Sequence, residues 1–197
     1  MTIWNERYNS EDFLFGKEPN RFFKEILDGL NPGKILLPAE GEGRNAVYAA
    51  KSGWDVHAFD ASRVGKDKAL QLAEEEGVNI SYRIGLIEDF EAESDSYDAI
   101  ALIYCHLQPD IRYDFFTKLV ESLAPGGILF LEVFRKEQHE LKSGGPGDPE
   151  LLYSAEQLAS GFNQLSQLNI IPETVWLDEG AGHQGEAKVV RLVGKKL

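Results

Sequence analysis

The stretch that decides the fold is Ile35-Leu36-Leu37-Pro38-Ala39-Glu40-Gly41-Glu42-Gly43-Arg44-Asn45-Ala46, an apolar run followed by a turn with two glycines. The apolar residues favour a buried strand, and the residues after Gly43 favour a helix. A strand, a glycine turn and a helix in this order bring backbone N–H groups and a helix N-terminus to one edge of a sheet. The pattern therefore predicts a ligand site at the end of the first strand.

A second strand-like run, residues 54–59, ends at Asp60. In nucleotide-binding α/β units, an acid at this place accepts hydrogen bonds from ribose hydroxyls. Aspartate is also a common helix N-cap, which is the structural alternative for Asp60. Together with the glycine turn, its position after a buried strand favours the ribose role and predicts an adenosine-type cofactor.

The bulk composition is that of an ordinary water-soluble domain. The chain has 197 residues, of which 43% are hydrophobic and 27% charged. This size suits one domain with a substantial core. We expect a single domain over 1–197, with a cap and helix in 1–30 and an α/β core in 31–197. No apolar stretch is long enough for a membrane span, and we expect a cytoplasmic protein.

The formal net charge of −13 argues against a nucleic-acid partner, because binding to phosphates depends on Lys and Arg. A small-molecule partner is expected instead, although the acidity also suits a merely solvated surface. The only cysteine, Cys105, and four scattered histidines predict neither a disulfide nor a metal site.

Strand-like and helix-like runs alternate from residue 31 onward, as in a parallel sheet with helices on both faces. Strands are predicted over 34–37, 54–59, 79–84, 98–103 and 128–134, and helices over 18–30, 45–52, 66–77 and 111–123. Two further strands, 169–178 and 187–193, are joined by the short connection 179–186, which suits an antiparallel hairpin. The fold class is therefore α/β and Rossmann-like, with a seven-stranded, mainly parallel sheet.

The glycine turn, the acid after the second strand, Pro125-Gly126-Gly127 before the fifth and the closing hairpin together resemble class I S-adenosylmethionine-dependent methyltransferases. Three segments are similar to a narrower group, the tellurite-resistance and thiopurine methyltransferase-like proteins: Gly41 to Tyr48; Gly144-Gly145-Pro146 with Asp148 to Tyr153; and Gly182-His183-Gln184-Gly185. The resemblance implies S-adenosyl-L-methionine as cofactor and S-adenosyl-L-homocysteine as product.

The resemblance also assigns cofactor contacts. The backbone around the glycine turn would hold the methionine part and ribose, Asp60 would bind the ribose hydroxyls, and Glu88 or Asp89 would lie near the adenine. Glu88 and Asp89 also suit a solvated loop. The full set expected to bind the cofactor is Ala39, Glu40, Gly41, Gly43, Asn45, Asp60, Ala61, Glu88, Asp89 and Tyr104.

The chain departs from the family pattern in the first strand, where Leu37 and Ala39 stand in place of the usual acid and first glycine. Leucine offers no oxygen to the amino group of the cofactor. Glu40 is a candidate substitute, with a plain turn residue as the alternative reading.

Two histidines are candidate catalytic residues. His106 follows the fourth strand, where an open α/β sheet presents its chemistry, and histidine titrates near neutral pH. The alternative is that His106 packs under the ligand or caps a helix. His183 lies in the Gly-rich hairpin connection, at a place suited to substrate contact or to a simple turn.

Residues at both ends of the core are candidates for covering the site. Relatives use the region before the first strand as a cap, which would give Tyr8, Phe15 and Asn20 this role. Arg135 and the loop 142–149 would form a wall or lid of the pocket, with a surface charge as the alternative for Arg135.

We expect methyl transfer from S-adenosylmethionine to a small-molecule nucleophile such as a thiol, metalloid or chalcogen species. Two alternatives remain open: a non-catalytic regulatory protein that binds S-adenosylmethionine, and an NAD(P)-dependent oxidoreductase that uses the same glycine pattern.

Overall fold

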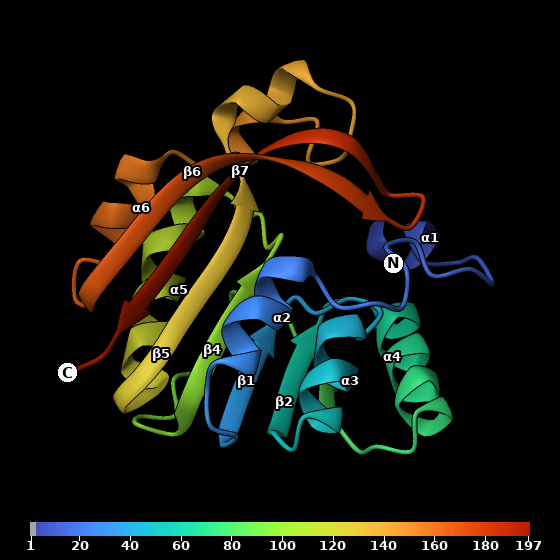
Figure 1. Cartoon of the computed structure of the whole chain (residues 1–197), viewed down its shortest axis with the longest axis horizontal. Coiled ribbons are helices and arrows are strands. Elements are labelled where there is room, and N and C mark those ends of the chain that lie inside the picture. The colour runs from blue at the N-terminus through green and yellow to red at the C-terminus, as the bar shows by residue number, and fades with distance from the viewer. Residues whose placement is uncertain (1–2) are drawn as a thin grey trace.

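The computed structural model describes residues 3–197, and these form one seven-stranded sheet flanked by helices (Figure 1). The strands are β1 (Lys34–Pro38), β2 (Asp55–Asp60), β3 (Ser81–Ile84), β4 (Tyr97–Ile103), β5 (Leu123–Phe134), β6 (Ser166–Glu179) and β7 (His183–Lys195). The helices are α1 (Ile3–Arg7), α2 (Arg21–Asp28), α3 (Arg44–Lys51), α4 (Arg63–Glu75), α5 (Pro109–Ser122) and α6 (Ala155–Gly161).

The strand order is β3-β2-β1-β4-β5-β7-β6. β1 to β5 pair in parallel, whereas β7 pairs antiparallel with both β5 and β6. This confirms the predicted Rossmann-like fold with a closing hairpin. Because parallel strands end at the same edge, the segments after β1, β2, β4 and β5 meet there.

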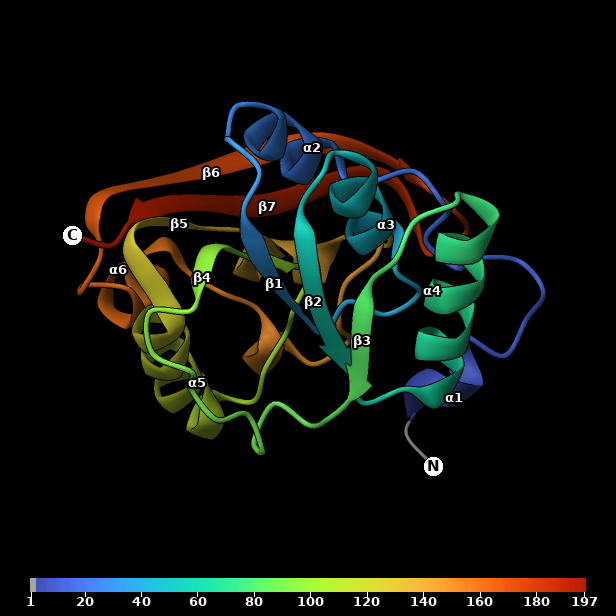
Figure 2. The same cartoon turned by 90° about the horizontal axis from the view of Figure 1, so that it is seen from below.

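Helices cover both faces of the sheet (Figure 2). On one face, α2 and α3 pack through a cluster that includes Phe23, Ala46 and Phe130. On the other face, α5 and α6 pack through a cluster that includes Phe115, Leu119 and Phe162. The core therefore lies in two layers with the sheet between them, as expected for a doubly wound α/β unit.

The observed elements differ from the expected ones mainly in the last third of the chain. The hairpin strands are longer than predicted, and their turn is confined to 180–182. The short helix α6 was not predicted, although Ser154 and Gln157 form a capping box at its N-terminus. Pro125-Gly126-Gly127 lies within an irregular start of β5 rather than in a separate turn.

Two non-glycine residues have a left-handed backbone directly after parallel strands. Ala39 has φ 52° after β1, and Tyr104 has φ 53° after β4. Such conformations cost about 1–3 kcal/mol each and are common at functional sites. β1 and β4 are neighbours in the sheet, so both conformations lie at the same carboxyl edge.

Within residues 3–197, no helix has the length and apolar character that crossing a membrane requires.

Candidate cofactor and acceptor site

The glycine turn after β1 is closely packed, and its two glycines are sterically required. Gly43 has φ 87°, and a Cβ added there would lie 2.4 Å from Cβ of Ala69. A Cβ added to Gly41 (φ 63°) would lie 2.6 Å from the Tyr8 hydroxyl oxygen. The turn therefore packs directly against α4 and Tyr8, and only residues without a side chain fit at these two positions.

Asp60 at the end of β2 lies directly against this turn. Its Oδ2 accepts a hydrogen bond from the Gly41 N–H at 3.0 Å, and its Oδ1 accepts one from the Ser62 N–H at 2.7 Å. Burial raises the pKa of Asp60, while these backbone N–H groups oppose the rise. Each carboxylate oxygen has a second lone pair for a ligand hydroxyl. Ala61 follows and is half-buried.

Glu40 turns toward α3 rather than outward. Its Oε1 accepts hydrogen bonds from the N–H groups of Asn45 at 2.9 Å and Ala46 at 2.7 Å, and so satisfies the first turn of the helix. Burial raises the pKa of Glu40 to about 7. Leu37, which stands where relatives carry an acid, lies fully in the apolar core. In this structure the carboxylate of Glu40 thus serves the protein's own helix.

A buried polar cluster adjoins the turn and connects four elements. Asn45 of α3 accepts a hydrogen bond through Oδ1 from the backbone N–H of Asn20 at 2.9 Å. The Asn20 side chain caps α2 through Oδ1 and donates through Nδ2 to Glu132 of β5 at 2.7 Å and to Glu179 of β6 at 3.1 Å. Asn20 therefore fixes α2, α3, β5 and the hairpin relative to one another.

Tyr104 joins this cluster from the end of β4. Its hydroxyl donates to Glu132 Oε1 at 2.8 Å, and its ring stacks on Phe134 with centroids 4.7 Å apart. Burial, followed by the negative charge of Glu132, raises its pKa well above the usual value. The ring of Tyr104 thus forms a wall at the carboxyl ends of β4 and β5.

The two candidate histidines have different partners. His106 Nδ1 lies 2.9 Å from the Leu151 carbonyl oxygen, and its Nε2 accepts from the Phe134 N–H at 3.3 Å. Both ring nitrogens are thus bound to backbone groups, with Nδ1 as the donor. Burial lowers the pKa of His106 to about 4, so the imidazole is neutral at pH 7.

His183 instead pairs with a carboxylate. Its Nδ1 lies 3.0 Å from Glu179 Oε2, and Glu179 Oε2 also accepts from Arg44 Nη2 at 3.0 Å. The imidazole is buried among aromatic rings, with centroid distances of 4.4 Å to Phe15 and 4.5 Å to Tyr104. The structure places His183 beside Tyr104, as the first residue of β7 rather than within the hairpin connection.

The segment before α2 covers the glycine turn. Tyr8 is buried against Gly41, stacks with Trp4 and contacts Phe15 edge to face. Lys68 of α4 donates to the backbone carbonyls of Tyr8, Ser10 and Asp12 and pairs with Glu42, which in turn accepts from the Leu14 N–H. The segment that was expected to act as a cap therefore has several polar attachments to the core.

The remaining predicted residues lie farther from this cluster or form fewer contacts. Glu88 and Asp89 are exposed in the loop between β3 and β4. Arg135 is half-buried at the end of β5, pairs with Glu137 at 3.6 Å, and its buried Nε has no hydrogen-bond partner within residues 3–197. Arg135 therefore carries a buried donor that no group of the described residues satisfies.

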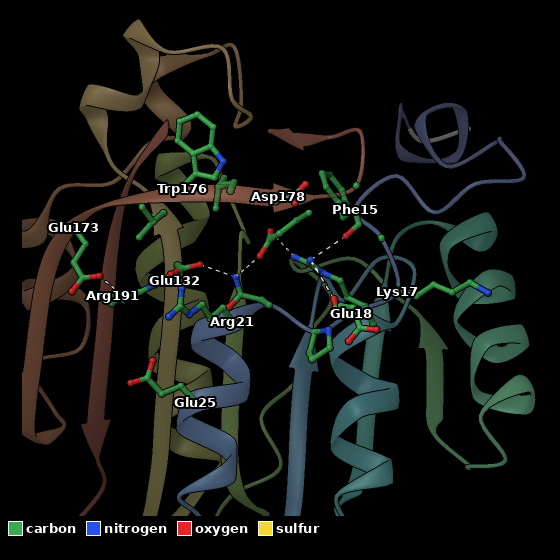
Figure 3. Close-up of a pocket in the computed structure, with 18 of the residues that line it drawn as sticks. Phe15, Lys17, Glu18, Arg21, Glu25, Glu132, Glu173, Trp176, Asp178 and Arg191 are labelled. Carbon is green, nitrogen blue, oxygen red and sulfur yellow. Dashed lines mark hydrogen bonds and ion pairs between the residues drawn. The ribbon is translucent and has the colours of Figure 1, made fainter. Parts of the chain in front are cut away.

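A cavity of about 750 Å³ opens between the start of α2 and the hairpin (Figure 3). Glu132, Arg191 and Glu173 form a row of ion pairs at its base, with Arg191 2.6 Å from Glu132 and 2.5 Å from Glu173. Trp176 projects from the hairpin above Arg191 and Glu132. The cavity adjoins Asn20, Arg44 and Glu179, but Gly41 and Asp60 do not line it.

Sequence reasoning missed four charged residues of this region: Arg44, Glu132, Glu179 and Arg191. One signal was present for Glu132, because it is the only charged residue in the apolar run 128–134 and a buried carboxylate requires partners. Arg44, Glu179 and Arg191 reach the site only through the register of the hairpin strands and the position of α3, and the sequence pattern determines neither.

The features of the turn fit an adenosine cofactor. The two glycines allow the turn to pack closely at the end of β1, and Asp60 holds a carboxylate beside Gly41. Tyr8, which packs on Gly41, and Phe15 beside it supply apolar cover. These residues match the hydroxyl groups and apolar surface of S-adenosylmethionine.

Comparison with known proteins agrees with this geometry. Residues 35–127 match the family model described as a methyltransferase domain. Among curated proteins, the ubiquinone biosynthesis O-methyltransferase of Rickettsia conorii is 25% identical over 114 residues, covering 58% of this chain and 39% of the relative. The chain therefore spans about two fifths of that protein.

Solved structures share the fold at low sequence identity. TehB from Haemophilus influenzae has a TM-score of 0.73 and 17% identity, covering 98% of this chain and 66% of TehB. Phosphoethanolamine N-methyltransferase 2 from Haemonchus contortus, in complex with phosphomonomethylethanolamine and S-adenosylhomocysteine, has a TM-score of 0.73 and 14% identity, covering 100% and 61% of the two chains. A structure concerned with conversion of a disulfide bond into a thioacetal group during echinomycin biosynthesis has a TM-score of 0.77 and 15% identity, covering 98% and 87%.

The family match covers the glycine turn, β2 and β4, and the fold of the whole described chain agrees with it. Residues 35–127 are thus similar to a methyltransferase domain, and the described chain has the Rossmann-like fold that these methyltransferase structures share.

Proposed function

We propose that this protein transfers the methyl group of S-adenosylmethionine to a small-molecule nucleophile. The observation that carries the proposal is the contact of Asp60 with Gly41 at the carboxyl edge of a sheet whose residues 35–127 match a methyltransferase domain. Methyl transfer is a displacement at carbon, so the protein contributes mainly alignment and exclusion of water. A packed cofactor turn beside a buried polar cluster whose members already hold one another in place suits that requirement.

Within this proposal, the cofactor lies along the ends of β1, β2 and β4. Asp60 accepts hydrogen bonds from the ribose hydroxyls, and the backbone from Ala39 to Gly43 contacts the methionine part. Asn45 and Tyr104 flank the turn, Ala61 follows the acid, and Glu88 and Asp89 are the candidates nearest the adenine. Glu40 contributes by fixing α3, through its bonds to Asn45 and Ala46.

The acceptor lies on the other side of the edge, between the cap and the hairpin. Tyr8, Phe15 and Asn20 cover the site, and Arg135 supplies a donor from the end of β5. The aromatic rings of Tyr104, Phe134 and His183 support an acceptor of small size, because they fill much of the space beyond β4.

The class of the acceptor is a thiol, a metalloid or chalcogen species, or a similar small nucleophile. Structural neighbours act on different acceptors: one structure concerns a disulfide converted into a thioacetal, and another binds phosphomonomethylethanolamine. The fold therefore accommodates both sulfur and nitrogen chemistry, and the acceptor of this chain must be found by assay.

The test is isothermal titration of the purified protein with S-adenosylmethionine and S-adenosylhomocysteine, alongside NAD and NADP. We expect micromolar binding of the first pair only, followed by methylation of at least one member of a panel of thiols, chalcogenides, phenols and amines. Binding of NAD or NADP instead would overturn the proposal. Binding of the sulfonium pair without turnover on any acceptor would support a regulatory role.

A further inference from the structure

Glu179 and His183 face each other across the tip of the β6–β7 hairpin. They are paired residues in the antiparallel ladder, so their side chains lie on the same face of the sheet. The distance from His183 Nδ1 to Glu179 Oε2 is 3.0 Å. The pairing is therefore set by strand register and does not depend on a flexible loop.

The Glu179 carboxylate accepts hydrogen bonds from three residues that belong to different parts of the fold. Arg44 from the first turn of α3 and His183 from β7 both contact Oε2, and Asn20 from the N-cap of α2 donates to Oε1. Although burial alone would raise the pKa of Glu179, the hydrogen bond to His183 and the charge of Arg44 outweigh it and lower the pKa to about 2. The carboxylate is ionised and fixed before any ligand binds.

This carboxylate determines which ring nitrogen of His183 carries the proton. An ionised carboxylate only accepts hydrogen bonds, so Nδ1 must be the donor. In the neutral ring, Nε2 then carries the lone pair. Within residues 3–197, no hydrogen-bond donor faces Nε2, whereas both nitrogens of His106 are bound to the backbone.

Gly144 lies against the edge of the His183 ring that carries Nε2. A Cβ added to Gly144 would lie 2.5 Å from Cδ2 and 3.2 Å from Nε2 of His183. Phe15, Tyr104 and Phe134 surround the ring. Tyr104 directly follows β4, and Phe134 is the last residue of β5. Gly144 therefore packs against the ring edge that carries Nε2, and a side chain at position 144 would displace the imidazole.

We infer that Glu179 is a positioning residue that holds His183 in the Nδ1–H tautomer, so that Nε2 receives the proton of the methyl acceptor. This inference rests on the proposed function. S-adenosylmethionine, when bound, supplies an electrophilic methyl group. As the acceptor atom bonds to the methyl carbon, the carbon–sulfur bond breaks with its electron pair on sulfur. The acceptor's proton passes to Nε2 of His183 and then to water.

The charges around His183 agree with a neutral base at physiological pH. Burial lowers the pKa of His183, the contact with Glu179 raises it, and Arg44 and Arg7 lower it. His106 and the hydroxyl of Tyr104 are the other titratable groups near the ring. Glu179→Gln removes the negative charge that raises the pKa of His183, so that pKa falls further.

The first test uses the wild-type protein without cofactor, so it does not depend on methyl transfer. Nitrogen-15 NMR of the histidine rings, with His183→Gln for assignment, reports the tautomer and pKa of each imidazole. We expect the Nδ1–H form of His183 near pH 7. Finding the proton on Nε2 would overturn the inference, whatever the outcome of the cofactor titrations.

The second test compares Glu179→Gln with Glu186→Gln, the same substitution on the same hairpin at an exposed position that pairs with Lys188 and does not line the cavity. For Glu179→Gln we expect kcat to fall about 10- to 100-fold, with an unchanged Kd for S-adenosylmethionine. The acid limb of the pH–rate profile should shift to lower pH with the pKa of His183. Glu186→Gln should match the wild type.

A purely structural role for Glu179 predicts a different pattern. The melting temperature and the Kd for S-adenosylmethionine would change, while the acid limb of the pH–rate profile and the His183 tautomer would stay in place. That combination would overturn the inference while leaving methyltransferase activity intact. If Glu179→Gln does not fold, the wild-type tautomer measurement still decides the question.

Discussion

The two halves of the carboxyl edge are built in different ways. Around the glycine turn, several contacts join residues that are close in the sequence, as between Asp60 and Ser62 or between Glu40 and Asn45. Around the hairpin, Glu179 binds Asn20 and Arg44, which come from the opposite end of the chain. A cofactor turn can therefore be recognised locally, whereas an acceptor site is completed only by tertiary packing.

The largest expected effect separates the two histidines of the acceptor half. His183→Gln should lower kcat by about 100-fold or more, because a proton acceptor at the reacting atoms contributes about 10²–10⁴-fold. His106→Gln should change kcat much less, since both of its ring nitrogens serve the backbone. Steady-state kinetics on the identified acceptor provides the measurement. A reversed order of the two variants would assign the base to His106.

The next largest effect separates the two halves themselves. Asp60→Ala should weaken S-adenosylmethionine binding about 100-fold, because two charge-assisted hydrogen bonds of about 1.5 kcal/mol each are lost. His183→Gln should leave this Kd unchanged within about twofold. Isothermal titration of both variants tests the division. Equal losses of affinity would show that the halves do not act separately.

The third prediction concerns two buried groups whose pKa values shift in opposite directions. The pKa of Glu40 rises from 4.5 to about 7, so its contribution to stability is present at low pH and is lost as pH rises through that range. The pKa of His106 falls from 6.5 to about 4, so its contribution is present above pH 6.5 and is lost as pH falls.

Between pH 4.5 and 6.5 these two contributions change by about 2 kcal/mol each, with opposite signs. Relative to the wild type, Glu40→Gln should gain unfolding free energy as pH rises, and His106→Gln should gain it as pH falls. Urea unfolding of each variant at several pH values provides the measurement. Parallel curves for a variant and the wild type would contradict the shift assigned to that residue.

The smallest expected effect comes from a substitution outside both halves of the carboxyl edge, in the cap of α6, which serves as a control. Ser154→Ala removes the capping box of α6 and should cost about 1 kcal/mol of unfolding free energy. We expect unchanged affinity for S-adenosylmethionine and unchanged kcat. A clear loss of either would show that α6 supports the site through β6.

The same contrast explains how much could be predicted from the sequence. The parallel strands were recognised because each is a short apolar run that ends at a turn residue, and the hairpin because its connection is too short for a crossover. The helix α6 was missed because it has few apolar residues in its seven positions, although Ser154 and Gln157 carried a local signal.

Prediction of individual site residues was less complete. Asp60 ends β2 and His183 begins β7, so the order of the strands in the sheet brings both residues to the same edge. The turning of Glu40 into α3 depends on where the N–H groups of Asn45 and Ala46 point. The partners of Glu132 come from α2, β4 and β7, so no local pattern identifies them.

The exposed indole at the rim of the cavity gives the protein an intrinsic optical reporter. Trp176 is 78% exposed, whereas Trp54 is 6% exposed in the core below α3. Iodide should therefore quench the emission of Trp176 and leave that of Trp54 nearly unaffected. A solute that covers the Trp176 indole would shift its emission to shorter wavelength, which allows ligands of this cavity to be found by fluorescence before an activity assay exists.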